Sequence, residues 1–98
     1  SPKFIYDAIK LTAEARLKRM KMRSWRRGTK EMDLVLGPWA DAHLAGLSAP
    51  ELEEYELLLA ENDQDLMAWS LGGSTPPAGF SALLARITTY ARDRLAGK

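Results

Sequence analysis

One stretch decides the fold: Ser24-Trp25-Arg26-Arg27-Gly28-Thr29-Lys30-Glu31-Met32-Asp33. It ends a dense basic run, breaks at a single glycine and then turns acidic. We interpret it as the end of one helix, a turn at Gly28 in the left-handed conformation, and a second helix capped by Thr29. Such a junction holds Arg27 and Glu31 close together. We interpret it as a docking epitope rather than a catalytic site.

Charge is strongly segregated along the chain. Residues 16–30 hold eight Lys or Arg and no acid, whereas residues 31–85 hold ten Asp or Glu and no Lys or Arg. The net charge is +8 over residues 1–30, −10 over residues 31–85 and +3 over residues 86–98, although the whole chain carries only +1. Such segregation indicates either complementary packing between helices or two faces for different partners.

The composition is that of one small globular domain. The 98 residues are 46% hydrophobic and 28% charged, unlike a disordered chain. We expect a single helical domain over residues 1–98, with a flexible N-terminus at 1–7 and a frayed C-terminus at 96–98. The lack of cysteine excludes disulfides, thiolate metal sites and cysteine nucleophiles, and it fits a reducing compartment. No apolar run approaches the roughly 20 residues of a membrane span, and residues 1–7 are too polar for a secretory signal. We therefore expect the bacterial cytoplasm or the mitochondrial matrix.

Helical periodicity runs through almost the whole chain, and no segment shows a sustained strand alternation. The expected helices cover about residues 6–26; Lys30 to near Gly46, kinked or broken at Gly37-Pro38; Ser48 to about Leu59; a short stretch capped by Asn62 or Asp63; and a last stretch after the loop of residues 72–77. Ser48-Ala49-Pro50-Glu51 is a capping box. These elements predict an all-α fold, a compact bundle of five short helices.

The apolar positions at helical spacing define the expected core. From the first helix to the last they are Ile9, Ala13, Leu17 and Met20, which share a face with Ser24; Met32, Val35, Leu36 and Trp39; Leu52, Tyr55, Leu58 and Leu59; Leu66, Met67 and Trp69; and Phe80, Leu83, Leu84, Ile87, Tyr90 and Leu95.

No set of residues indicates catalysis. His43 is the only histidine, which excludes a two-histidine metal site, and a lone histidine on a helix face is more often packed than a general base. The acids of residues 51–56 are spread around a helix, as expected of a solvated face. The segment Asp63-Gln64-Asp65 lacks the calcium-loop pattern, and Gly72-Gly73-Ser74 lacks the lysine of a phosphate loop. We predict no enzyme, no metal and no cofactor bound by this chain itself.

The basic run supports a rival interpretation. Eight positive charges between Arg16 and Lys30, with Trp25 among them, are typical of a surface that follows a phosphate backbone. This reading makes the chain a small nucleic-acid-binding or antitoxin-like protein. The strongly acidic second half opposes it, and no recognition helix or RNA-binding signature accompanies the run.

The residues around the junction carry a more specific signal. Arg27-Gly28-Thr29-Lys30-Glu31 matches an Arg-Gly-x-x-Glu motif, with further matches at Arg26; Leu34-Val35-Leu36; Trp39 and Ala40; His43-Leu44; Leu52, Tyr55 and Leu58-Leu59; Asp63 and Asp65; Trp69; and Pro76-Pro77. In order and spacing over about residues 16–90, the chain resembles the FAD assembly factors of succinate dehydrogenase, the SdhE type of bacteria and its mitochondrial counterparts. Thr29 and Lys30 stand where the family often has apolar residues.

The resemblance implies a monomeric chaperone that binds the flavoprotein subunit of succinate dehydrogenase, and in some organisms that of fumarate reductase. The factor would promote the covalent attachment of FAD to a client histidine without being the catalyst, so that FAD belongs to the client, and neither nucleic acid nor a membrane is a partner. The partner-binding residues expected from the motif and the adjoining basic stripe are Arg23, Arg26, Arg27, Gly28, Lys30 and Glu31. Because Arg27 and Glu31 flank a turn open to solvent, we expect each to contribute little to stability.

Overall fold

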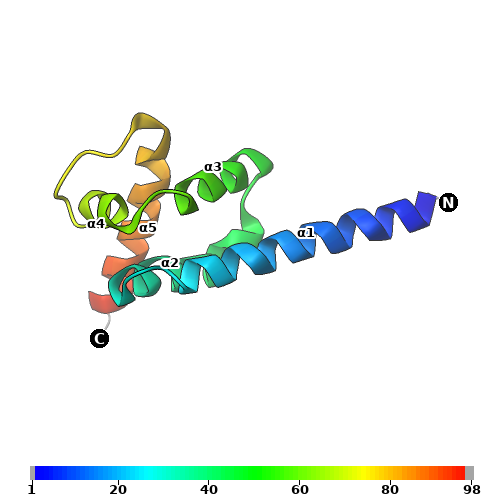
Figure 1. The fold of residues 1–98 in the computed structure, drawn as a ribbon, viewed down its shortest axis with the longest axis horizontal. Helices are drawn as coiled ribbons and strands as arrows, with labels where there is room; N and C mark the ends of the chain where they lie inside the picture. Colours follow the sequence, from blue (N-terminus) through cyan, green and yellow to red (C-terminus); the bar gives the residue numbers. More distant parts are fainter. Residues whose placement is uncertain (1, 97–98) are drawn as a thin grey trace.

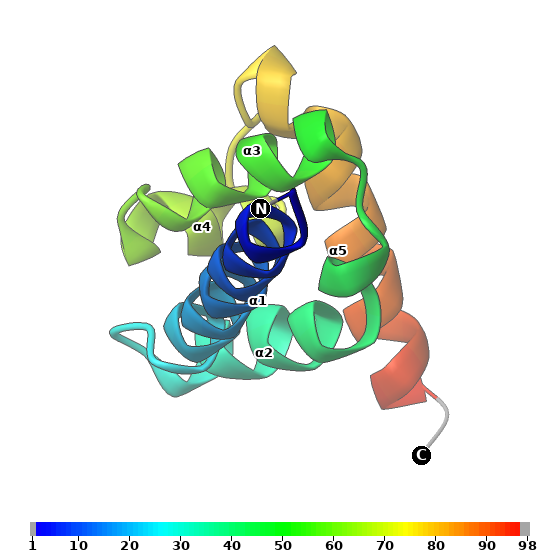
Figure 2. The ribbon, with the colours of Figure 1, turned by 90° about the vertical axis from the view of Figure 1, so that its right-hand side faces the viewer.

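The computed structural model describes residues 2–96, with side chains from residue 9 onward. Its helices are α1 (Pro2–Trp25), α2 (Lys30–His43), the 3-10 turn η1 (Leu44–Gly46), α3 (Ala49–Leu59), α4 (Asp63–Ser70) and α5 (Ala78–Ala96). This part of the chain contains no strand, so the predicted all-α bundle of five helices is confirmed. In the end-on view of Figure 2, α1 lies between α3 and α2, with α4 and α5 on either side. The expected fraying of residues 97 and 98 lies outside the described residues.

The helix α1 is longer than the sequence pattern predicts. It begins at Pro2 rather than near residue 6, and it ends at Trp25. Its N-terminal half extends beyond the other helices (Figure 1). Ile9 and Ala13 are exposed there, so the prediction that they join the core is wrong. Only the C-terminal part of α1 packs against the rest of the molecule.

The helix α2 passes through Gly37-Pro38 without a break, so the predicted interruption is wrong. Pro38 has no N–H to donate to the carbonyl of Leu34, one turn earlier. Arg94 of α5 supplies a donor in its place, because its Nη2 donates to the Leu34 carbonyl oxygen at 3.0 Å. With that acceptor satisfied, the helix continues to His43.

Side-chain caps set the starts of the next helices, as the sequence predicts. Thr29 Oγ1 accepts a backbone N–H in the first turn of α2 at 3.3 Å. Ser48 Oγ accepts the N–H of Glu51 at 3.3 Å while Glu51 Oε1 accepts the N–H of Ser48 at 2.9 Å, which is the predicted capping box. Of the two candidate caps for α4, Asn62 is the one used, and its Oδ1 accepts the N–H of Asp65 at 2.9 Å.

The core is centred on Trp39 and Tyr55, whose rings lie 5.2 Å apart. Both side chains are almost completely buried. Ser24 donates to the carbonyl oxygen of Met20 at 2.8 Å, and its hydroxyl lies 2.6 Å from the Tyr55 hydroxyl, which serves as the donor of that pair. Burial raises the pKa of Tyr55 to about 12, so the phenol keeps its proton at neutral pH. The hydroxyl pair therefore links α1 to α3 inside an otherwise apolar core.

Two further core assignments have opposite outcomes. The ring of His43 lies 5.5 Å from that of Trp39 and 5.0 Å from that of Tyr90, so the interpretation of a packed histidine is confirmed. Leu95 is 64% exposed. It lines an open hollow together with Leu71, where no side chain covers it, so the prediction that Leu95 joins the core is wrong.

We predict that Ser48→Ala lowers the free energy of unfolding by about 0.5–2 kcal/mol, because the first turn of α3 loses its side-chain cap. Urea melts measure the loss, with Ser74→Ala in the exposed loop as the control. The Ser48 N–H holds the pKa of Glu51 below its usual value. The stabilisation from the charged Glu51 is therefore present at neutral pH and is lost as the pH falls through that pKa. An equal effect of the two serine substitutions would contradict the assignment of the cap.

Candidate functional site

Arg27 points inward from the junction, toward the end of α3 and the start of α4. Its Nη1 donates to the carbonyl oxygen of Leu59 at 2.6 Å, and its Nη2 donates to that of Glu61 at 2.7 Å. Its Nε forms an ion pair with Asp63 Oδ1 at 2.9 Å. Only 11% of the Arg27 side chain is exposed. A guanidinium offers five N–H donors in a fixed fork, so one side chain satisfies three acceptors at once.

This arrangement also caps α3. Leu59 is the last residue of α3, and the last carbonyls of a helix have no partner within it. The positive charge of Arg27 lies at the negative end of the α3 dipole. Asp63 is the first residue of α4, where a carboxylate is favoured by the positive end of that helix. The pair thus satisfies the end of one helix and the start of the next.

Gly28 belongs to the same arrangement for a reason that differs from the predicted one. Its N–H donates to Asp63 Oδ2. A Cβ at this position would lie 2.5 Å from that oxygen, too close for any other residue without movement of the carboxylate. Among the described residues, the glycine with a positive φ is Gly72, so the predicted left-handed conformation of Gly28 is wrong. Glycine is needed here for close approach. We refer to Arg27, Gly28 and Asp63 together as the clasp.

The start of α2 holds the clasp from the other side. Asp33 Oδ1 accepts the backbone N–H of Arg27 at 2.5 Å. Thr29, besides capping α2, directs its hydroxyl to the sulfur of Met67 in α4 at 3.8 Å. The backbone between α1 and α2 is therefore fixed by contacts to α2, α3 and α4.

The structure separates the predicted site residues into two groups. Arg27 and Gly28 both bond to Asp63; Gly28 is exposed, but the Arg27 side chain is largely buried, so the expectation that solvent surrounds Arg27 is wrong. The side chains of the other predicted residues are exposed and make no hydrogen bond or ion pair within residues 9–96; they are Arg23, Arg26, Lys30 and Glu31. Glu31 lies in the first turn of α2, directly after the turn that the clasp fixes.

Sequence reasoning missed the roles of Asp33 and Asp63. Asp63 lies 36 positions from Arg27 along the chain, and its local pattern indicates only a helix start. The segment from α3 to the start of α4 is acidic and contains no Lys or Arg. This local excess of negative charge is the one sequence signal that predicts a cation from elsewhere in the chain. Asp33 gives no signal, because acids are common in the first turn of any helix.

The described part of the chain shows neither a group of metal-binding side chains nor a helix that could cross a membrane. Within residues 9–96, no three His, Asp or Glu side chains are grouped to hold a metal ion. None of the helices found there has the length and apolar character needed to cross a bilayer.

The chain matches known proteins over most of its length. The family described as flavinator of succinate dehydrogenase matches residues 18–91. Succinate dehydrogenase assembly factor 2, mitochondrial, of Meyerozyma guilliermondii is 41% identical over 59 residues, covering 60% of this chain and 44% of that protein. The same-named protein of Cryptococcus neoformans is 33% identical over 70 residues, covering 69% and 40%. FAD assembly factor SdhE of Acetobacter pasteurianus is 32% identical over 84 residues, covering 85% and 77%. The chain thus spans less than half of the two fungal proteins and about three quarters of the bacterial one.

We predict that Arg27→Ala lowers the free energy of unfolding by about 2–4 kcal/mol, because it leaves the Asp63 carboxylate and two carbonyls without their charged donor. The neighbouring exposed Arg26→Ala is the matched control and should stay within about 0.5 kcal/mol. In urea melts, Arg27→Ala combined with Asp63→Ala should cost at least about 1 kcal/mol less than the sum of the single changes. A loss for Arg27→Ala as small as that for Arg26→Ala would show that the clasp does not stabilise the fold.

We also predict that Gly28→Ala lowers the free energy of unfolding by about 1–3 kcal/mol. The new Cβ displaces the Asp63 carboxylate, which can move only by breaking its bonds to Arg27 and to the Gly28 N–H. Gly46→Ala is the control, since a Cβ there meets nothing within 4 Å and the glycine has no positive φ. Thermal melts measure both. In an Asp63→Ala background, Gly28→Ala should become nearly neutral, and an unchanged cost there would rule out the clash with Asp63.

Proposed function

This chain belongs to the family of flavinators of succinate dehydrogenase, and we propose that it is an assembly factor that binds the flavoprotein subunit of that enzyme. In this proposal it promotes the covalent attachment of FAD to a histidine of the client. The match over residues 18–91 supports it, because that range includes the junction and all the helices that hold the clasp. The fungal relatives are named as assembly factors of succinate dehydrogenase, and the bacterial relative is named as an FAD assembly factor.

The observation that carries the proposal is the exposed Glu31 on a fixed junction. Its carboxylate has no partner among the described residues and can accept hydrogen bonds from a client donor. The clasp prevents the turn before Glu31 from rearranging, so little conformational entropy is lost on binding. Arg23, Arg26 and Lys30 supply exposed cations on the end of α1 and the start of α2. We assign Arg27 and Gly28 as positioning residues that act through Glu31.

The chemical step belongs to the client and its FAD. The bond forms between the client histidine and the flavin, and this chain stabilises the client conformation that permits it. Its one histidine supports that division, because the His43 ring is packed between Trp39 and Tyr90. We further propose that the chain acts as a monomer, in the bacterial cytoplasm or the mitochondrial matrix. Relatives from bacteria and from mitochondria support this location. The client range extends in this proposal to the flavoprotein of fumarate reductase.

We predict that Glu31→Ala abolishes most of the covalent flavin on the client while leaving the factor folded. A charge-assisted contact at an interface typically contributes about 2 kcal/mol or more, whereas loss of the dipole interaction costs under about 1 kcal/mol of stability. In-gel flavin fluorescence of the client, from cells in which each variant replaces the natural factor, measures the first effect. Thermal melts of the purified factor measure the second.

Glu53→Ala is the matched control, since Glu53 is an exposed acid on α3, away from the junction. It should leave flavin attachment unchanged. Normal flavin on the client in Glu31→Ala cells would place the contact surface elsewhere. Loss of flavin with Glu53→Ala as well would show a general charge effect instead of a specific contact.

A further inference from the structure

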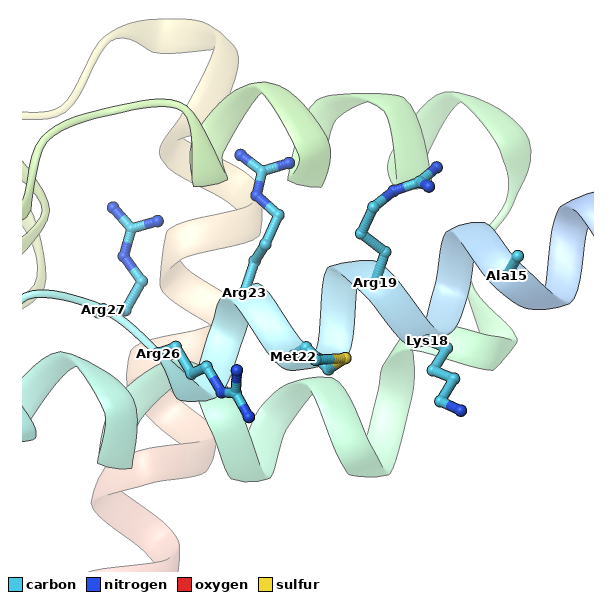
Figure 3. Close-up of a pocket in the computed structure, with 7 residues that line it drawn as sticks. All are labelled: Ala15, Lys18, Arg19, Met22, Arg23, Arg26 and Arg27. Carbon is cyan, nitrogen blue, oxygen red and sulfur yellow. The ribbon is translucent and has the colours of Figure 1, made fainter.

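The outer side of α1 carries an open hollow of about 490 Å³ next to the junction. Five cations line it: Arg27, which is paired with Asp63, and Lys18, Arg19, Arg23 and Arg26. Met22 supplies apolar surface between them. In Figure 3, Arg19 and Arg23 project from one side of the helix, with Lys18, Met22 and Arg26 on the adjacent side. Met22 is 45% exposed, although methionine is usually a core residue. We call this hollow the basic groove.

The cations of the basic groove are only partly compensated within the molecule, because Arg19 and Arg23 lie close enough to Glu56 of α3 to help lower its pKa. Other basic side chains have acidic partners, as in the ion pairs of Arg16 with Glu56 at 2.7 Å and of Arg86 with Glu51 at 3.0 Å. In the described part of the chain, none of the groove cations other than Arg27 makes a side-chain hydrogen bond or an ion pair. Like charges at four-residue spacing on a helix repel each other, as Arg19 and Arg23 do. An anion bound in the groove would relieve this repulsion.

The dimensions and surroundings of the groove favour a short segment of protein. From Lys18 to Arg26 the helix rises about 12 Å, the length of three or four residues of extended chain. Met22 suits an apolar side chain, which a phosphate backbone does not offer. Nucleic-acid affinity depends on many phosphate contacts, and a longer polyanion would meet Glu56 and the other acids of α3 beside the groove.

We propose that the basic groove binds a short acidic segment of the client flavoprotein, with an apolar side chain of that segment placed against Met22. This inference rests on the proposed function and extends its contact surface along α1. The groove ends at Arg26 and Arg27, where the clasp begins, so one client surface can reach both Glu31 and the groove. Glu31 then fixes the position of the client, and the groove attracts it and adds affinity.

The test is a titration of the purified client flavoprotein with the full chain at low and at moderate salt. Lys18→Glu combined with Arg23→Glu should weaken binding at least about tenfold and flatten its salt dependence, because like charges then oppose the acidic segment. Lys10→Glu combined with Arg92→Glu changes the net charge equally at exposed sites outside the groove and should weaken binding less than about threefold. Met22→Gln, with no change in charge, should weaken binding severalfold. Circular dichroism melts confirm that each variant is folded.

The outcomes separate this inference from the proposed function. If the groove variant binds as well as its control while Glu31→Ala does not, the groove proposal is overturned and the proposed function stands. If the unaltered chain does not bind the flavoprotein, both are overturned.

Tighter binding of a short single-stranded DNA than of the client, lost in the groove variant, would assign the groove to nucleic acid. A dimer of the unaltered chain that dissociates in the groove variant would assign it to a second copy. Either result would overturn the proposal.

Discussion

The ion pair between Arg27 and Asp63 is the constraint on which the junction depends. It joins the end of α1 to the start of α4, and the same guanidinium satisfies the carbonyl at the end of α3. Two helix ends and one turn therefore share a single set of hydrogen bonds. Such shared networks make the loss of one member more costly than the loss of one bond, because the remaining partners stay buried without a donor.

This geometry changes how the Arg-Gly-x-x-Glu motif is interpreted. From the sequence alone, the three fixed residues of the motif suggest three contacts with a partner. In the structure, Arg27 and Gly28 both bond to Asp63, and of the two charged side chains in the motif, Glu31 is the one that is exposed and without a partner among the described residues. The residues of one motif can therefore have different roles: Arg27 and Gly28 make the junction rigid, and Glu31 is held in a fixed position on it. A glycine without a positive φ is favoured here because a Cβ would displace the Asp63 carboxylate.

Local signals made most of the fold predictable, and long-range pairing accounts for what was not. The caps at Thr29, Ser48 and Asn62 depend on residues within one turn, so a single sequence is enough to place them. The continuity of α2 through Pro38 depends on Arg94, which is 60 positions away, and no local pattern announces that donor. The roles of Arg27 and Asp63 escape prediction for the same reason, because apolar periodicity shows which face is buried but not which polar groups meet there.

The hydroxyl pair of Ser24 and Tyr55 has a consequence for the register of α1. Only the last turns of this long helix rest on the bundle, and a helix held by a few apolar contacts could slide along its axis with little penalty. A shift of one turn, about 5.4 Å, would place the Ser24 hydroxyl against apolar side chains and leave the Tyr55 hydroxyl without its acceptor. The same shift would carry Arg27 away from the corner between α3 and α4. One buried hydrogen bond between α1 and α3 thus fixes the axial position of α1, and with it the position of the Arg27 guanidinium.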